Sequence, residues 1–232
     1  MKTRQILLAS AAVAGLSLVN AAAANANQWY VSVAGGANWA DDSSFSLATV
    51  PSSSTTFVFA NDVDTGFVFT GAVGMHLGQY MQGLRGEVEL GYRENNVRGA
   101  WSTATSTSAY SGIADYQHST FSVMANVWYD FQVGGLKPYI GGGVGWARTE
   151  LDGRFTHSTT VSDALSDEES GFAFQLGAGL NFDIQPGLQG TLGYRYFEGP
   201  DVSLRAPHSW NPLAGDIENE NHSVTVGLIV AM

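Results

Sequence analysis

The chain has 232 residues, of which 44% are hydrophobic and only 13% are charged. A soluble domain usually carries about 25% charged residues, so this chain has too little charge to cover a water-facing exterior. Its formal net charge of −11 argues against a nucleic-acid partner, and the absence of cysteine excludes a disulfide framework and a lipoprotein anchor.

The first 26 residues have the pattern of a secretory signal peptide. Lys2 and Arg4 precede an apolar run over residues 6–19, and the small residues Ala24 to Ala26 follow it. This run is shorter than the roughly 20 residues of a membrane-spanning helix. We therefore expect cleavage after Ala26, as signal peptidase requires small residues there, which leaves residues 27–232 as the mature barrel domain.

The mature chain contains eight segments in which apolar and small or polar residues alternate. A period of two is typical of β-strands that expose their two faces to different surroundings. The segments lie near residues 29–39, 65–77, 84–93, 116–131, 136–148, 172–183, 191–196 and 223–230. No apolar run of 18 or more residues is present, so a membrane location requires a closed barrel.

The connections between these segments alternate in length. Three are short, near residues 78–83, 132–135 and 184–187, and four are long and polar, near 40–64, 97–115, 150–169 and 198–220. Outer-membrane barrels place short turns in the periplasm and long loops outside the cell. The pattern predicts an all-β fold: an eight-stranded antiparallel up-and-down transmembrane barrel with both ends in the periplasm.

A soluble eight-stranded barrel of the lipocalin kind is the competing architecture. Its strands also alternate, but the face opposite the apolar one meets water and carries many charges. Here that face consists mostly of Gly, Ala, Ser, Thr, Asn and Gln, as in Phe172 to Asp183. Such residues suit the narrow interior of a membrane barrel of this size.

Four stretches resemble a known family. They are Lys137–Trp146 (KPYIGGGVGW), Arg85–Arg93 (RGEVELGYR), Asn126–Phe131 (NVWYDF) and Gly193–Tyr196 (GYRY). They are similar to the small OmpA-like outer-membrane β-barrel superfamily, which includes opacity-type porins and surface antigens. The resemblance implies a monomer in the outer membrane of a Gram-negative bacterium. Its partners would be outer-membrane lipid and lipopolysaccharide, the barrel-assembly machinery during insertion, and a host or surface ligand bound through the loops.

Six charged residues share the phase that faces the barrel lumen: Glu87, Glu89, Arg93, Asp130, Asp183 and Arg195. A charge at that depth needs a partner or water. The third and seventh strands lie across the barrel from each other, so Arg195 is within reach of Glu87 or Glu89. The simpler interpretation is a satisfied ion-pair network that plugs the lumen, and the alternative is a gate whose pairs exchange partners and pass small solutes.

The histidines raise an enzymatic alternative, because some barrels of this size modify lipid A with His and Ser. Adjacent strand residues point to opposite faces, so His118 and Ser119 cannot pair readily, nor can His222 and Ser223. Five scattered histidines show no metal-site spacing. We expect no catalytic residue, no cofactor and no metal.

Aromatic residues near the strand ends are expected at the two membrane interfaces, where amphipathic rings are enriched. They are Trp29, Trp39, Tyr92, Tyr129, Phe131, Trp146, Phe182 and Tyr196. The predicted loops are acidic, which suits a solvated surface or divalent-cation bridging to lipopolysaccharide.

These features favour a non-enzymatic outer-membrane protein with an envelope-structural and surface-exposed, antigen- or adhesin-like role. The alternatives are a narrow porin-like channel gated by the lumen ion pairs and a lipid A-modifying barrel enzyme.

Overall fold

The computed structural model describes residues 29–40, 56–104, 109–158, 161–205, 214–217 and 219–232. Within these ranges all regular elements are strands, and no helix has the length and apolarity to traverse a bilayer. The strands are β1 (Trp29–Ala40), β2 (Thr56–Val63), β3 (Gly66–His76), β4 (Leu84–Ala104), β5 (Ala109–Asp130), β6 (Leu136–Ser158), β7 (Val161–Gln185), β8 (Leu188–Glu198), β9 (Val202–Arg205), β10 (Ala214–Ile217) and β11 (Glu220–Ala231).

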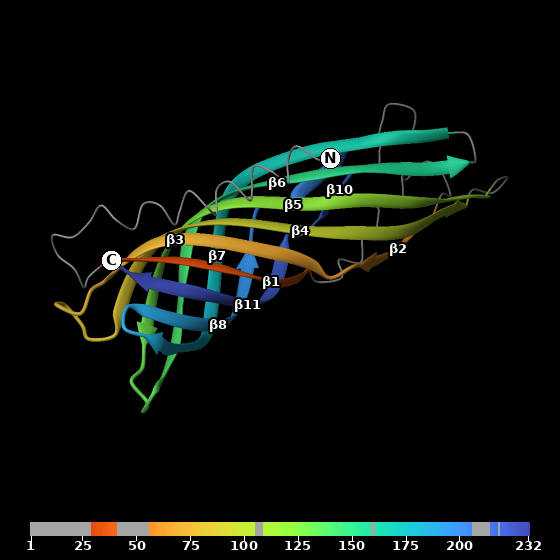
Figure 1. The fold of residues 1–232 in the computed structure, drawn as a ribbon. Coiled ribbons are helices and arrows are strands. Elements are labelled where there is room, and N and C mark those ends of the chain that lie inside the picture. Colours follow the sequence, from red (N-terminus) through yellow and green to blue (C-terminus); the bar gives the residue numbers. More distant parts are fainter. Residues whose placement is uncertain (1–28, 41–55, 105–108, 159–160, 206–213, 218) are drawn as a thin grey trace.

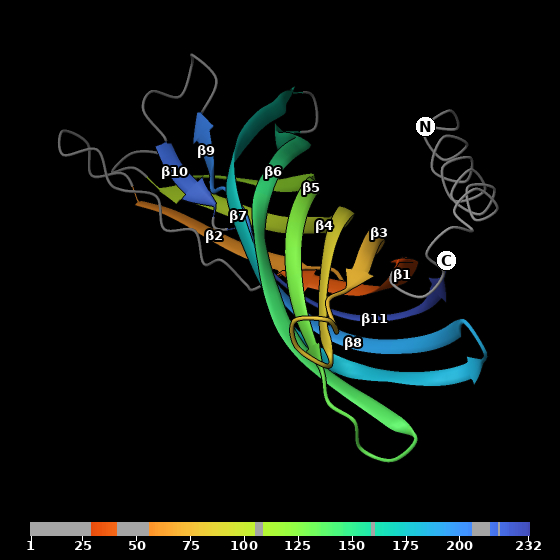
Figure 2. The same cartoon turned by 90° about the vertical axis from the view of Figure 1, so that its left-hand side faces the viewer.

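Eight of the strands close into a barrel (Figures 1 and 2). Neighbours pair antiparallel in the order β1, β3, β4, β5, β6, β7, β8 and β11, and β11 pairs back with β1. The predicted eight-stranded antiparallel barrel is thus confirmed. β2 pairs with the far end of β4, and β9 forms a separate hairpin with β10.

The side chains alternate between lumen and exterior along every wall strand. On β5, Ser122, Met124 and Asn126 are buried, whereas Phe121 and Val123 are exposed. The exposed large apolar residues therefore lie on the outside, which is the reverse of a soluble barrel. They form a continuous outer apolar band, as expected of a wall that faces lipid.

The three short connections are tight turns that each contain a glycine with positive φ. These are Gly83 (87°), Gly134 (61°) and Gly187 (79°). Glycine adopts this conformation without the steric cost that a Cβ would bring. Sequence reasoning located all three turns.

The predicted extent of two long loops, 97–115 and 150–169, is wrong. β4 continues to Ala104 and β5 begins at Ala109, while β6 continues to Ser158 and β7 begins at Val161. The predicted loops 40–64 and 198–220 also contain strands, namely β2, β9 and β10. Apolar alternation ends where a strand leaves the bilayer, because both sheet faces can then be polar, so the periodicity no longer marks the strand.

The barrel is consequently taller on one side. β4 to β7 have 21 to 25 residues each, whereas β1, β3, β8 and β11 have 11 or 12. Figure 1 shows the long strands running well past the short ones. We call the part of β4 to β7 beyond the apolar band the tall wall. The strands of the tall wall stay in register: Arg98 of β4 is the cross-strand partner of Asp115 on β5, which is in turn the partner of Arg154 on β6.

Candidate functional site

The lumen is the candidate site, and its periplasmic layer is built around Arg85. The guanidinium forms a two-point bond with Asp130, with Nε to Oδ2 at 2.6 Å and Nη2 to Oδ1 at 3.0 Å. It also lies over the rings of Tyr30 and Tyr139, at 5.5 and 5.7 Å from their centroids. Both charges are buried. This two-point geometry fixes the orientation of the pair.

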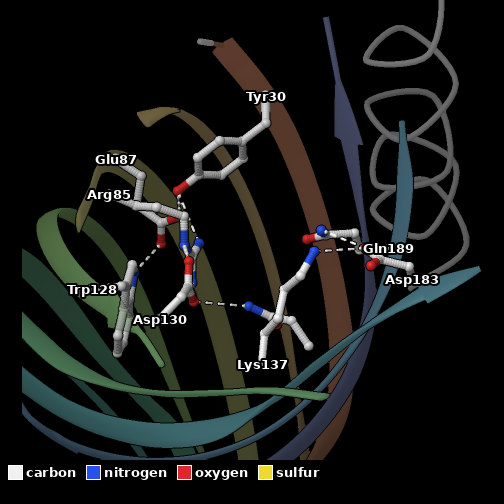
Figure 3. Close-up of polar contacts among 9 residues, drawn as sticks. Tyr30, Arg85, Glu87, Trp128, Asp130, Lys137, Asp183 and Gln189 are labelled. Carbon is white, nitrogen blue, oxygen red and sulfur yellow. Dashed lines mark hydrogen bonds and ion pairs between the residues drawn. The ribbon is translucent and has the colours of Figure 1, made fainter. Parts of the chain in front are cut away.

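Glu87 completes this layer, and within the described ranges its carboxylate forms no ion pair. Its carboxylate accepts hydrogen bonds from the Tyr30 hydroxyl at 2.8 Å, Trp128 Nε1 at 2.8 Å and Asn126 Nδ2 at 3.1 Å. Figure 3 shows Tyr30, Glu87, Arg85, Asp130 and Trp128 converging on one side of the lumen. The donors come from β1 and β5 and the acceptor from β4, so the layer ties three strands together.

The middle layer is centred on Glu89. Its carboxylate bonds to Arg195 and accepts a hydrogen bond from Gln175 Nε2 at 3.0 Å. Arg93 donates to Ser122 Oγ at 3.1 Å and lies 3.7 Å from the ring centroid of Phe197. The Nε atoms of Arg93 and Arg195 are buried without a hydrogen-bond partner. This layer therefore holds two guanidinium groups and one carboxylate, which bonds to Arg195 and Gln175.

The extracellular layer is neutral. Asn38 donates to Asn221 at 2.8 Å, Asn221 donates to Asn219 at 2.7 Å, and Asn219 donates to Thr149 at 2.8 Å. Asn95 meets Asn38 on the other side. This amide and hydroxyl chain crosses the lumen above the charged layers and holds residue 219, at the base of the β8–β11 connection, inside the mouth.

His118 lies beyond the apolar band, facing inward from the tall wall. Its cross-strand neighbours are Asn95 and Leu151. The imidazole is buried, and Nε2 has no hydrogen-bond partner. Burial lowers the pKa of His118 from 6.5 to about 4, because the imidazolium would lose its hydration there. His118 is therefore neutral at physiological pH.

Asp183 differs from the prediction that placed it in the buried network. It lies at the periplasmic rim, where its side chain is 57% exposed and bonds to Lys137 Nζ at 2.8 Å and Gln189 Nε2 at 2.8 Å (Figure 3). These two hydrogen bonds, from Lys137 first, lower the pKa of the Asp183 carboxyl. Asp183 does lie on the inward-facing phase of β7. It comes one residue after Phe182, at the edge of the barrel, so its carboxylate is in contact with water.

A cavity of about 520 Å³ opens beside this rim. Tyr30, His76, Asp183, Gln189 and the β7–β8 turn are among the residues that line it. Tyr30 also binds Glu87 and Arg85, so this residue connects the cavity to the periplasmic layer.

The structure brings Glu89 and Arg195 together and places Glu87, Arg93 and Asp130 in the buried lumen. Sequence reasoning missed Arg85, Tyr30 and Gln175. Arg85, Glu87 and Glu89 are alternate residues of the same strand, so their side chains point to the same side. The alternation alone was therefore enough to place Arg85 in the lumen. Tyr30 and Gln175 could not be identified as partners, because their contacts join residues 57 and 86 positions apart.

Among the described residues, His222 and Ser223 lie on opposite faces of β11. Ser223 is buried in the lumen, whereas His222 is on the outer face and meets the Tyr194 hydroxyl at 2.6 Å through Nδ1. In the part of the chain that the structure covers, no group of three His, Asp or Glu side chains could hold a metal ion.

The eight predicted interfacial aromatics all lie on the outward phase; six are near strand ends, and Tyr92 and Trp146 lie midway along the long strands β4 and β6. Trp29, Tyr129, Phe131 and Phe182 mark the periplasmic end, and Trp39, Tyr92, Trp146 and Tyr196 mark the extracellular end. Beyond the second group the outer face becomes polar, with Glu94, Glu150, Glu168 and Asp152. The two groups therefore delimit the apolar band.

Comparison with known proteins agrees with this geometry. Residues 8–229 match the family model described as the outer membrane protein beta-barrel domain. Uncharacterised proteins of Brucella abortus and Brucella melitensis are 30% identical over 129 residues. That alignment covers 49% of this chain and 45% of each relative, so the chain spans about half the length of the curated relatives it matches.

Two solved structures have the same fold at low sequence identity. Neisserial surface protein A has a TM-score of 0.53 and 17% identity, with coverage of 88% of this chain and 97% of the other. Outer membrane protein OprG of Pseudomonas aeruginosa has a TM-score of 0.50 and 16% identity, with coverage of 90% and 98%.

Proposed function

Because this chain belongs to the outer membrane protein beta-barrel family, we propose that it serves envelope structure and surface presentation through a lumen that stays closed. It is a Gram-negative outer-membrane protein, and lipid surrounds its apolar band. We propose further that the extracellular side has an antigen- or adhesin-like role. The proposal includes no catalytic activity.

The observation that carries the proposal is the bond between Arg195 and Glu89 across the lumen, set between two further cross-lumen layers. The six charges of Arg85, Arg93, Arg195, Glu87, Glu89 and Asp130 balance, and all but Arg195 are buried. A solute would have to displace ion pairs and amide contacts in succession. Such a plug costs free energy to open, because each separated charge would lose its partner in a narrow interior.

Single-channel recording tests the closed lumen. Residues 27–232 are refolded, checked for folding on unboiled gels and inserted into planar bilayers. We expect no discrete openings from folded protein. Regular openings from the wild-type chain would contradict the closed lumen.

A gated channel is the second candidate, and the unpartnered Nε atoms of Arg93 and Arg195 favour it. A second guanidinium near Glu89 offers that carboxylate an alternative partner. If the lumen network is a gate, the wild type gives small openings, and Arg195→Ala or Glu89→Gln enlarges them. Unchanged openings in both variants would exclude this network as the gate.

The non-enzymatic part of the proposal rests on the separation of His222 from Ser223 and on the inward position of His118. We expect lipid A from cells that express the chain to keep its mass. A mass change that depends on His222 would instead support the lipid A-modifying alternative.

Surface presentation predicts that the extracellular side, rather than the barrel, carries any ligand. Shortening the β6–β7 hairpin within residues 150–169, where β6 and β7 form part of the tall wall, should abolish binding to a host or surface ligand while the barrel still folds. The same proposal includes removal of residues 1–26, assembly by the barrel-assembly machinery, contact with lipopolysaccharide and a monomeric state. N-terminal sequencing of outer-membrane fractions should begin at Asn27.

A further inference from the structure

A polar and aromatic patch interrupts the outer wall where the short strands β1, β11 and β8 reach the extracellular boundary. Trp39, His222 and Tyr196 are successive cross-strand partners on the outward face. The ring centroid of His222 lies 5.3 Å from Tyr196 and 6.4 Å from Trp39, and Tyr194 bonds to its Nδ1. These side chains form one contiguous surface rather than isolated girdle residues.

Two carboxylates border this surface. Glu198 and Glu220 are direct cross-strand partners, both on the outward phase and both half-buried. The Tyr196 hydroxyl donates to Glu198 Oε2 at 2.9 Å. Like charges directly opposite each other destabilise a sheet, and a nearby bilayer weakens their hydration. A cation at this position would relieve the repulsion.

The neighbouring groups favour an organic ammonium over a metal ion. Aromatic faces attract ammonium groups, whereas divalent cations prefer several oxygen ligands. The described side chains here include no group of three His, Asp or Glu that could hold a metal. Val224 and Val226 continue from the patch into the apolar band, so a bound molecule would have its apolar part in the bilayer.

We propose that the outer-leaflet patch, made of Trp39, Tyr194, Tyr196, Glu198, Glu220 and His222, binds a lipid whose headgroup carries an ammonium group. The ammonium lies beside the two carboxylates and against the aromatic rings, and the acyl chains lie along Val224 and Val226. The position of the patch at the edge of the lipid-facing band and its charge select this occupant. The inference is independent of whether the lumen conducts.

Native mass spectrometry of the refolded chain tests the proposal. The protein is released from micelles that contain equal amounts of dimyristoylphosphatidylcholine, which carries an ammonium group, and dimyristoylphosphatidylglycerol, which does not. We expect phosphatidylcholine to be retained with a preference on the order of threefold to tenfold, as for cation–π and exposed ionic contacts. The double variant Glu198→Gln, Glu220→Gln should lose this preference.

A matched control distinguishes lipid binding at the patch from a general effect of removing negative charge. Glu94→Gln with Asp152→Asn removes the same charge from the outer face of β4 and β6, where the two carboxylates accept from the hydroxyls of Tyr92 and Ser166, and should leave the preference unchanged. Trp39→Leu keeps all charges and should reduce the preference. Equal retention of both lipids by the folded wild type would overturn the proposal. So would a preference for phosphatidylglycerol that requires added calcium, because the patch would then bind a metal-bridged anion.

Discussion

Arg195 on β8 and Glu89 on β4 form an ion pair across the barrel, although the chain separates them by 106 residues. Replacing Arg195 by Ala leaves a buried carboxylate without its charge partner. We expect this variant to lose about 3–5 kcal/mol of unfolding free energy. Urea unfolding from vesicles, followed by tryptophan fluorescence, measures the loss.

Two controls accompany this variant. The double variant Glu89→Gln, Arg195→Met removes both charges and should recover most of the loss. Lys137→Met breaks the exposed pair with Asp183 and should change stability by less than about 1 kcal/mol. Equal losses of unfolding free energy in Arg195→Ala and Lys137→Met would show that the buried pair contributes no more to stability than the exposed pair.

Gly143 on β6 leaves space that the neighbouring strand occupies. A Cβ at this position would lie 2.0 Å from Asn126 Oδ1 and 2.5 Å from the backbone oxygen of Ala125. Gly143→Ala should therefore destabilise the barrel by roughly 1–3 kcal/mol or prevent folding. Gly135→Ala, where nothing lies within 4 Å of a Cβ, is the matched control. The folded fraction on unboiled gels should fall only for Gly143→Ala.

His118 makes stability depend on pH. Its pKa is about 4 in the folded chain and 6.5 when free, so folding favours the neutral form. The stabilisation is complete above pH 6.5 and is lost as the pH falls toward 4. Between pH 7 and 4, the wild type should lose on the order of 3 kcal/mol more unfolding free energy than His118→Leu. Parallel pH profiles of the two proteins would refute this role of His118.

Val226 tests the position of the bilayer. It is 66% exposed on the outer face of β11, in the apolar band. Val226→Lys should cost about 2–4 kcal/mol in vesicles, since a charge there must leave water. Asn96→Lys, on the outer face of the tall wall, should have little effect. A similar cost for both substitutions would place the bilayer elsewhere.

Sequence reasoning reached the barrel because lipid and lumen impose different chemistry on alternate residues. Phe121 and Ser122 illustrate this, as one is exposed to the outside and the other is buried. The same reasoning failed on the tall wall, where Asp152 and Ser166 belong to long strands that carry polar outer faces. It also counted Asp183 as buried, because phase gives direction but not depth along the barrel.

The sequence by itself determined which residues face lipid, how many strands cross the membrane and where the three short turns lie, because these properties depend on local alternation and on glycine. The tertiary structure alone decided that Arg85 binds Asp130, that Arg195 binds Glu89 rather than Glu87, and that Glu198 lies opposite Glu220. Those pairings depend on barrel closure and strand register, which set distances between residues far apart in the chain.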